Sequence, residues 1–223
     1  KGTKMIFYSY EEFKEDVILK PCANRGFDVG PFIEALRDVD LDNYDIVYKV
    51  HSKGIKRPKI YIYGQVFCWR DWFENLFNGL FTPLKVLITA KTLTQQNRYG
   101  LVAAKNLIVN DPVHKKHFVQ QWAERLGIQV SDHYKFVAGT CFAIRASLLK
   151  EIQQLELNLD SFEQTKRGDF SLAHAVERLV CACVANQGYD YLGLTTVKNP
   201  HFLISTICKL TDSERLHRDN RFS

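Results

Sequence analysis

A glycine-containing turn that precedes an amphipathic segment is the feature that most limits how this chain can fold. The turn lies in residues 24–33, where Gly26 and Gly30 allow backbone conformations or close approaches that a Cβ atom would obstruct. Pro31 suits the first turn of a helix, because its missing N–H group would have no partner within the helix there. The sequence therefore predicts a strand over 16–21, a tight turn, and a helix over 31–39.

A second apolar segment, residues 44–50, ends in the polar cluster His51-Ser52-Lys53. Its nearly continuous hydrophobicity is typical of a strand that is buried on both faces. In open α/β sheets, ligands bind beyond the carboxyl ends of the strands, where helix N-termini favour anions. We therefore expect the turn and the end of this strand to form one site. The alternatives are a solvated turn in which Asp28 caps the helix, and a structural, hydrogen-bonded His51.

The rest of the chain alternates strand-like and helix-like segments, which predicts an α/β sheet. Further strands are expected over residues 4–9, 85–89, 101–109, 136–144 and 189–197. Further helices are expected over residues 66–79, 114–126, 147–155 and 171–186, with 92–98 as a polar connection. The aromatic residues of 66–79 recur at helical intervals, and core packing explains them better than a platform for sugars.

Length and composition predict one globular domain. The 223 residues, 46% of them hydrophobic, can bury one sizeable core, which we place in residues 1–207 with a charged tail over 208–223. The abrupt start at Lys1 suggests a piece of a longer protein. No run of about 18 apolar residues occurs, and the six cysteines, mostly in apolar stretches, are expected to be buried, reduced thiols of a cytosolic protein.

The net charge of +5 suits an anionic ligand or an acidic membrane surface, although most basic residues are scattered. Lys53, Lys56, Arg57 and Lys59 form the one dense run, which is either a solvated loop or a site that attracts phosphate or lipid headgroups. A nucleic-acid module would need a basic stripe with interleaved aromatic residues on one face, and the sequence has none. We therefore exclude nucleic acid as a partner.

Five segments together resemble the rhamnan synthesis F family of bacterial polysaccharide glycosyltransferases. These segments are NRGFDVGPFIEAL (24–36), YDIVYKVHSKG (44–54), WRDWFENLF (69–77), AGTCFAIRASLL (138–149) and GDFSLAHAVERLV (168–180). They follow one another in the family's order and span most of the chain, so the match is more specific than any one motif.

The resemblance implies a GT-A-like (Rossmann-like) mixed sheet flanked by helices. It also implies a glycosyltransferase of the inverting kind that moves a sugar such as rhamnose to a growing rhamnan, O-antigen or capsule-type polysaccharide. The donor would be a nucleotide-sugar, with a dTDP-sugar favoured over a UDP-sugar, and the acceptor a lipid-linked glycan. The enzyme would act in the cytoplasm, at the inner face of the plasma membrane, alone or with other domains of the same polypeptide.

The resemblance also assigns donor-binding residues, and it contains one departure. The Asp-x-Asp metal site of related GT-A enzymes falls on His51-Ser52-Lys53, which offers no carboxylate to a divalent cation. Positive side chains can neutralise a leaving diphosphate instead, so we expect no obligatory metal. The residues expected to bind the donor are Asn24, Arg25, Gly26, Asp28, His51 and Lys53.

The acidic residue that accepts a proton in related inverting enzymes corresponds in sequence order to Asp169. One carboxylate must take the proton of the acceptor hydroxyl as its oxygen attacks the anomeric carbon, and a junction between a loop and a helix can hold it in reach. The competing interpretation makes Asp169 the N-cap of the helix 171–186, a position that Asp favours.

A third set of residues is expected to contact the acceptor or the diphosphate: Arg70, Gly139, Thr140, Arg145, His174 and Arg178. His174 and Arg178 share a helix face because they are four residues apart. For that pair the alternative is buried polar anchoring of the helix. For Gly139 it is a β-bulge, and for Arg70 and Arg145 a surface salt bridge.

Two other functions remain open from the sequence. A non-catalytic domain of a larger polysaccharide-assembly protein would bind glycan or a partner while another domain does the chemistry. A phosphotransferase would move a polyol phosphate during capsule assembly. Loss of Asp169 distinguishes the non-catalytic domain from a glycosyltransferase, because it should abolish turnover by a transferase and leave binding by a non-catalytic domain unchanged.

Overall fold

The computed structural model describes residues 20–51, 59–62, 65–68, 72, 75–111, 113–131, 134–163 and 171–195. Its centre is a four-stranded sheet with the order β1 (Ile46–Lys49), β7 (Phe142–Arg145), β4 (Tyr99–Ala104), β8 (Asp190–Leu194). β7 runs antiparallel to both β1 and β4, whereas β4 and β8 are parallel. The expectation of a mixed sheet is therefore confirmed.

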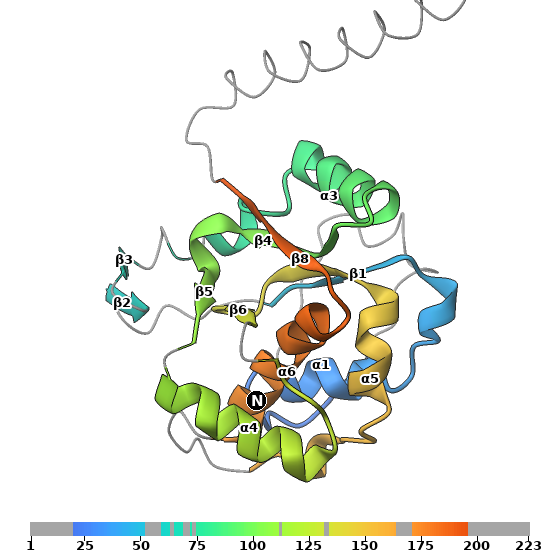
Figure 1. The fold of residues 1–223 in the computed structure, drawn as a ribbon, viewed down its shortest axis with the longest axis vertical. Coiled ribbons are helices and arrows are strands. Elements are labelled where there is room, and N and C mark those ends of the chain that lie inside the picture. Colours follow the sequence, from blue (N-terminus) through green and yellow to red (C-terminus); the bar gives the residue numbers. More distant parts are fainter. Residues whose placement is uncertain are drawn as a thin grey trace, which may run out of the picture.

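Two further pairs of strands are antiparallel and lie outside the central sheet. They are β2 (Lys59–Ile62) with β3 (Gln65–Cys68), and β5 (Ile108–Asn110) with β6 (Lys135–Val137). β6 also packs against α6, so this second pair extends the core, whereas the β2–β3 pair lies to the side of the sheet in Figure 1.

Helices cover both faces of the central sheet (Figure 1). The α-helices are α1 (Val29–Leu36), α3 (Pro83–Gln95), α4 (Val113–Leu126), α5 (Lys150–Gln153) and α6 (Leu172–Asn186). Short 3₁₀ turns are η3 (Leu41–Asn43), η4 (Lys105–Leu107), η5 (Ala146–Leu149) and η6 (Leu159–Ser161). Figure 1 shows α3 on one side of the sheet and α1, α5 and α6 on the other, with α4 beyond α6.

The strands divide their side chains between two cores because successive residues of a strand point to opposite faces. Val102 and Ala143, which pair across β4 and β7, belong to a small core with Leu93 of α3. Leu101 and Ile144, the neighbouring pair, belong to the large core with α1 and α6. α6 is buried along most of its length, which explains why its sequence is apolar almost all around.

Several elements confirm the sequence-based boundaries to within a few residues. The helices predicted at 31–39, 114–126 and 171–186 correspond to α1, α4 and α6, and the strands predicted at 44–50 and 189–197 contain β1 and β8. Pro31 occupies the first turn of α1, as expected. Ser147–Leu155 is helical only in part, as η5 followed by α5.

The strand predicted at 85–89 is wrong, because these residues lie within α3. Their β-branched side chains favour a strand locally, but Thr82 and Pro83 supply a helix start with proline at its first position. The polar connection predicted at 92–98 is also partly helical, since α3 extends to Gln95. The buried Leu93 packs into the small core, and this tertiary packing outweighs the weak local propensity of these residues.

Two predicted strands are each divided between different sheets. Residues 101–109 contain β4, η4 and β5, and residues 136–144 contain β6 and β7. The second division occurs at Gly139, where positive φ values turn the chain from one sheet to the other. Gly139 is therefore more than the bulge that the alternative supposed. The helix predicted at 66–79 begins instead with β3, although residues 75–77 are helical.

Cysteines divide between the interior and the surface of the described regions. Cys141, Cys181 and Cys183 are buried, as predicted, whereas Cys22 and Cys68 are exposed. Burial raises the pKa of the Cys181 thiol to about 12.

Some expectations fall outside the structural description. The strand at 4–9, most of the strand at 16–21 and the domain boundary at 207 lie in segments that the structure does not describe. Within the segments that it does describe, every helix is too short or too polar to cross a bilayer.

Candidate functional site

Two turns far apart in the sequence meet at the carboxyl end of β1. The first carries Gly26, Phe27 and Asp28 and leads into α1, and the second carries Gly139 and Thr140 and leads into β7. Because β7 is antiparallel to β1, Lys49 at the end of β1 pairs with Phe142 at the start of β7. This register brings the second turn to the same sheet edge as the first.

Both turns contain backbone conformations that side chains rarely adopt. Phe27 and Thr140 have φ values of 56° and 51°, and they are two of three non-glycine residues with positive φ in the described segments. Each follows a glycine with positive φ. Such conformations cost free energy and persist where surrounding contacts enforce them, and they cluster at functional sites. Close approach also explains Gly30, since a Cβ atom there would lie 2.1 Å from the Arg25 carbonyl oxygen.

Lys49 is the centre of the polar cluster between these turns. Its side chain is 4% exposed, and its ammonium group donates to Asp28 Oδ2 at 2.7 Å, to the Thr140 carbonyl oxygen at 3.0 Å and to Thr140 Oγ1 at 2.9 Å. An ammonium group has three donors, so these contacts use all of them. Lys49 therefore holds the two turns together and has no donor left for a ligand.

Asp28 supplies the negative charge of the cluster. Burial alone would raise the pKa of its carboxyl, but the charges of Lys49 and His51, with hydrogen bonds from Lys49 and Thr140, hold that pKa well below its usual range. Asp28 occupies the N-cap position of α1 without making a side-chain capping bond. The alternative in which Asp28 only caps the helix is therefore wrong, because its carboxylate is directed at Lys49 and Thr140.

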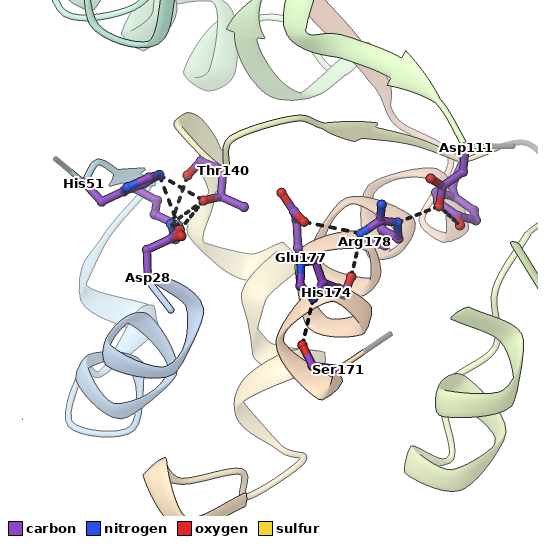
Figure 2. Close-up of polar contacts among 10 residues, drawn as sticks. Asp28, His51, Asp111, Thr140, Ser171, His174, Glu177 and Arg178 are labelled. Carbon is purple, nitrogen blue, oxygen red and sulfur yellow. Dashed lines mark hydrogen bonds and ion pairs between the residues drawn. The ribbon is translucent and has the colours of Figure 1, made fainter. Parts of the chain in front are cut away.

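His51 completes the cluster, and Figure 2 shows its ring directed toward Asp28 and Thr140. His51 Nε2 lies 2.6 Å from the Gly139 carbonyl oxygen, 3.2 Å from Thr140 Oγ1 and 3.4 Å from Asp28 Oδ2. Nε2 must carry a proton because a carbonyl oxygen only accepts. His51 is thus hydrogen-bonded in the way that its structural alternative supposed, and its side chain is still 13% exposed.

Four predicted residues therefore come together: Asp28, His51, Gly139 and Thr140. The same turn carries Asn24, which is exposed, and Arg25, whose guanidinium lies 2.5 Å from Asp160 Oδ1 of η6. Gly26 packs close to Phe162, just after η6. Arg25 and Gly26 thus contact the segment after α5 rather than the Lys49 cluster.

His174 approaches the first turn from α6. Its ring packs edge-on against Phe27 with the ring centroids 5.3 Å apart, and its Nδ1 lies 2.7 Å from Ser171 Oγ. Ser171, not Asp169, is the N-cap residue of α6, so the capping alternative for Asp169 does not hold.

Arg178 lies in a second, buried cluster with Asp111, apart from the Lys49 cluster (Figure 2). Its Nε is 2.8 Å from Asp111 Oδ2, which also accepts from the Tyr134 hydroxyl at 2.7 Å. Its guanidinium also bonds the His174 carbonyl oxygen and stacks on Phe136. These contacts favour the alternative of buried polar anchoring over the expected contact with acceptor or diphosphate.

Arg145 is also directed away from the cluster. It lies at the far end of β7 from Thr140, and its guanidinium donates to the carbonyl oxygens of Tyr99 at 2.9 Å and Gln96 at 2.7 Å. These bonds connect β7 to the first residue of β4 and to the segment before it, so the structure does not bring Arg145 to the Lys49 cluster. The remaining predicted residues, Lys53, Arg70 and Asp169, lie outside the described segments.

Lys49, the centre of this cluster, is absent from the site residues that the sequence predicted. The available signal was its spacing, because Lys49 and His51 are two residues apart and thus point to the same face of an extended chain. In the described part of the chain, no group of three His, Cys, Asp or Glu side chains is arranged to hold a metal ion.

Comparison with known proteins identifies relatives. A family model described as rhamnan synthesis protein F matches residues 3–189. Two curated proteins, both called uncharacterized protein WxcX and from strains of Xanthomonas campestris pv. campestris, are each 26% identical over 188 residues. The matches cover 78% of this chain and 24% of each relative, so the chain spans about a quarter of their length. No solved structure matches the chain.

Proposed function

Because the chain belongs to the rhamnan synthesis protein F family, we propose that it is a glycosyltransferase domain of polysaccharide synthesis. The family implies a role in making rhamnan or a related polysaccharide. The proposed reaction transfers a sugar, with rhamnose as the first candidate, from a dTDP- or UDP-linked donor to a growing cell-surface glycan. The proposed fold is of the GT-A type, which the mixed sheet with helices on both faces supports.

The observation that carries this proposal is the cluster of Asp28, Lys49, His51 and Thr140. Two segments that are separated in the sequence, the glycine turn and the end of β1 with His51, meet in this cluster, which contains strained backbone and a buried ion pair. A domain that only needed stability gains little from a buried ion pair, since apolar residues of similar volume serve as well. The cluster at this sheet edge combines strained backbone, charged groups and partial exposure, which together are typical of a ligand site.

Asp169 is the proposed proton acceptor. The reaction needs a carboxylate beside the acceptor hydroxyl, and Asp169 precedes α6, whose residue His174 touches the first turn through Phe27. Asp28 is poorly suited to this role, because a carboxyl with a strongly lowered pKa is a weak base. Glycosyl transfer by this arrangement is proposed to proceed without an obligatory metal, with inversion at the anomeric carbon.

The proposed setting is the inner face of the plasma membrane, where a lipid-linked glycan would be the acceptor. Peripheral contact with the membrane and cooperation with other domains of the same polypeptide are parts of this proposal. The second is supported by the relatives, which are about four times as long as the matched region.

Calorimetric titration with dTDP, UDP, GDP and CMP, each with and without manganese, tests the proposal. We expect one nucleotide to bind saturably, also in the presence of a chelator, and Asp169→Asn to abolish turnover while leaving that binding intact. Binding that needs manganese would contradict the metal-independent mechanism. No binding to any nucleotide would contradict the transferase itself.

A non-catalytic glycan-binding domain is the second candidate. The observation that favours it is Lys49, whose three donors are all used within the protein and which therefore cannot neutralise a diphosphate. Binding of a rhamnose oligosaccharide without binding of any nucleotide, and indifference to Asp169→Asn, would support this candidate.

A further inference from the structure

The two carboxylate oxygens of Asp28 have different surroundings. Oδ2 is near three groups, the ammonium of Lys49, the hydroxyl of Thr140 and Nε2 of His51. Within the described segments, no protein group is hydrogen-bonded to Oδ1. The Asp28 side chain nevertheless remains 20% exposed. One strong acceptor is thus held in a fixed position at the edge of the cluster.

The charge of the cluster limits which ligand group can bind there. Asp28 stays ionised over the physiological range because its pKa is held low, so Oδ1 can only accept a hydrogen bond. The diphosphate of a nucleotide-sugar has no proton to donate at neutral pH and is repelled by a carboxylate. The two neighbouring cationic groups do not reverse this. Lys49 is paired with Asp28 and its donors are used, and Nε2 of His51 is directed at the Gly139 carbonyl oxygen.

We propose that the cluster binds a hydroxyl group of the ligand through Oδ1 of Asp28, and that the diphosphate binds elsewhere. Lys49 is then the positioning residue of the site: it fixes Asp28 by holding Oδ2, while Oδ1 faces the ligand. The inference rests on the proposed function for the source of the hydroxyl, which is either the transferred or acceptor sugar or the ribose of the nucleotide. It reverses the expectation that His51 and its neighbours neutralise the leaving diphosphate.

Three probes separate these possibilities on the wild-type protein. Isotope-labelled protein is titrated with methyl α-L-rhamnoside, with uridine and with inorganic pyrophosphate, and the NMR signals of the Asp28 carboxyl carbon and the Gly139 and Thr140 amides are followed. We expect saturable shifts with the rhamnoside if the hydroxyl belongs to a sugar, or with uridine if it belongs to ribose, and none with pyrophosphate. Shifts with pyrophosphate, or with none of the three, would overturn the proposal.

Asp28→Asn provides a second test, because the expected change in affinity has opposite signs for a ligand hydroxyl and for a ligand phosphate. The amide cannot match a charged acceptor, so affinity for the hydroxyl probe is expected to fall about tenfold. If Asp28 instead lay beside a phosphate, removing its charge would raise the affinity for pyrophosphate. Asp42→Asn is the matched control: it makes the same change in a side chain that is 75% exposed and lies in η3, and it should leave both affinities unchanged.

The hydroxyl site and the proposed transferase can be refuted independently of each other. Nucleotide binding by calorimetry without any response of the cluster to hydroxyl probes would overturn the hydroxyl site and leave the transferase standing. A response to the rhamnoside without binding of any nucleotide would establish the hydroxyl site and exclude the transferase. If Asp28→Asn does not fold, the titration of the wild-type protein decides alone.

Discussion

The ammonium group of Lys49 lies 2.7 Å from Asp28 Oδ2, and the same carboxylate oxygen accepts from the hydroxyl of Thr140. Asp28 and Thr140 are 112 positions apart in the sequence. Lys49 is thus a buried connection between two turns whose backbones are both strained. It costs free energy to bury this charge, and only a complete set of partners compensates for the lost hydration.

Replacing Lys49 with methionine should destabilise the fold strongly. Lys49→Met leaves the buried Asp28 carboxylate without its counter-charge, so the free energy of unfolding should fall by about 3–5 kcal/mol in urea denaturation. The double variant Asp28→Asn/Lys49→Met should lose less than the sum of its two single variants.

Lys150→Met is the control for this loss. Lys150 pairs with Asp42, but both side chains are largely exposed, so the cost should be about 1 kcal/mol or less. Equal losses for the two lysine variants would show that the buried position of Lys49 does not matter.

Acid should destabilise the protein through Asp28. The folded-state pKa of this carboxyl lies below its unfolded value of 3.8, so its stabilising contribution is complete above that value and is lost as the pH falls below it toward the folded pKa. Urea unfolding between about pH 6 and about pH 3 should show stability falling at the acid end, and less steeply in Asp28→Asn. Parallel profiles for the two proteins would contradict this assignment.

Gly139→Ala should cost more than Gly127→Ala. Both glycines have positive φ, 83° and 72°, so each alanine has a backbone penalty of about 1–2 kcal/mol. A Cβ atom at Gly127 would meet nothing within 4 Å, whereas at Gly139 it would lie 2.8 Å from atoms of Trp72 and Leu76. The difference in unfolding free energy between the variants measures this crowding, and equal losses would rule it out.

Arg178→Met should affect stability rather than binding. Its partner Asp111 is fully buried, so removing the guanidinium should lower the free energy of unfolding by about 3–5 kcal/mol. Arg98→Met, at a side chain that is 71% exposed and paired with Asp190, should cost little. A folded Arg178→Met protein that loses nucleotide or glycan affinity would instead assign Arg178 to the binding site.

Local patterns in the sequence predicted much of the framework. The 3.6-residue periodicity and the end signals located α4 and α6, and Pro31 with its glycine turn located α1. Where local signals conflict, they failed: residues 85–89 have strand-like side chains but lie in α3, because their helix start and tertiary packing outweigh propensity. In the apolar run 136–144, Gly139 indicated an interruption such as a β-bulge, but not that the chain passes there from one sheet to another.

The sequence by itself determined that Asp28 and His51 would follow a glycine turn and a strand end, because turn chemistry and strand periodicity are local properties. Only the tertiary structure decided their partners. The antiparallel register of β7 against β1 brings Thr140 to Lys49, and the buried Lys49 becomes the centre of the cluster. Register and burial depend on contacts between residues far apart in the chain, which no local pattern records.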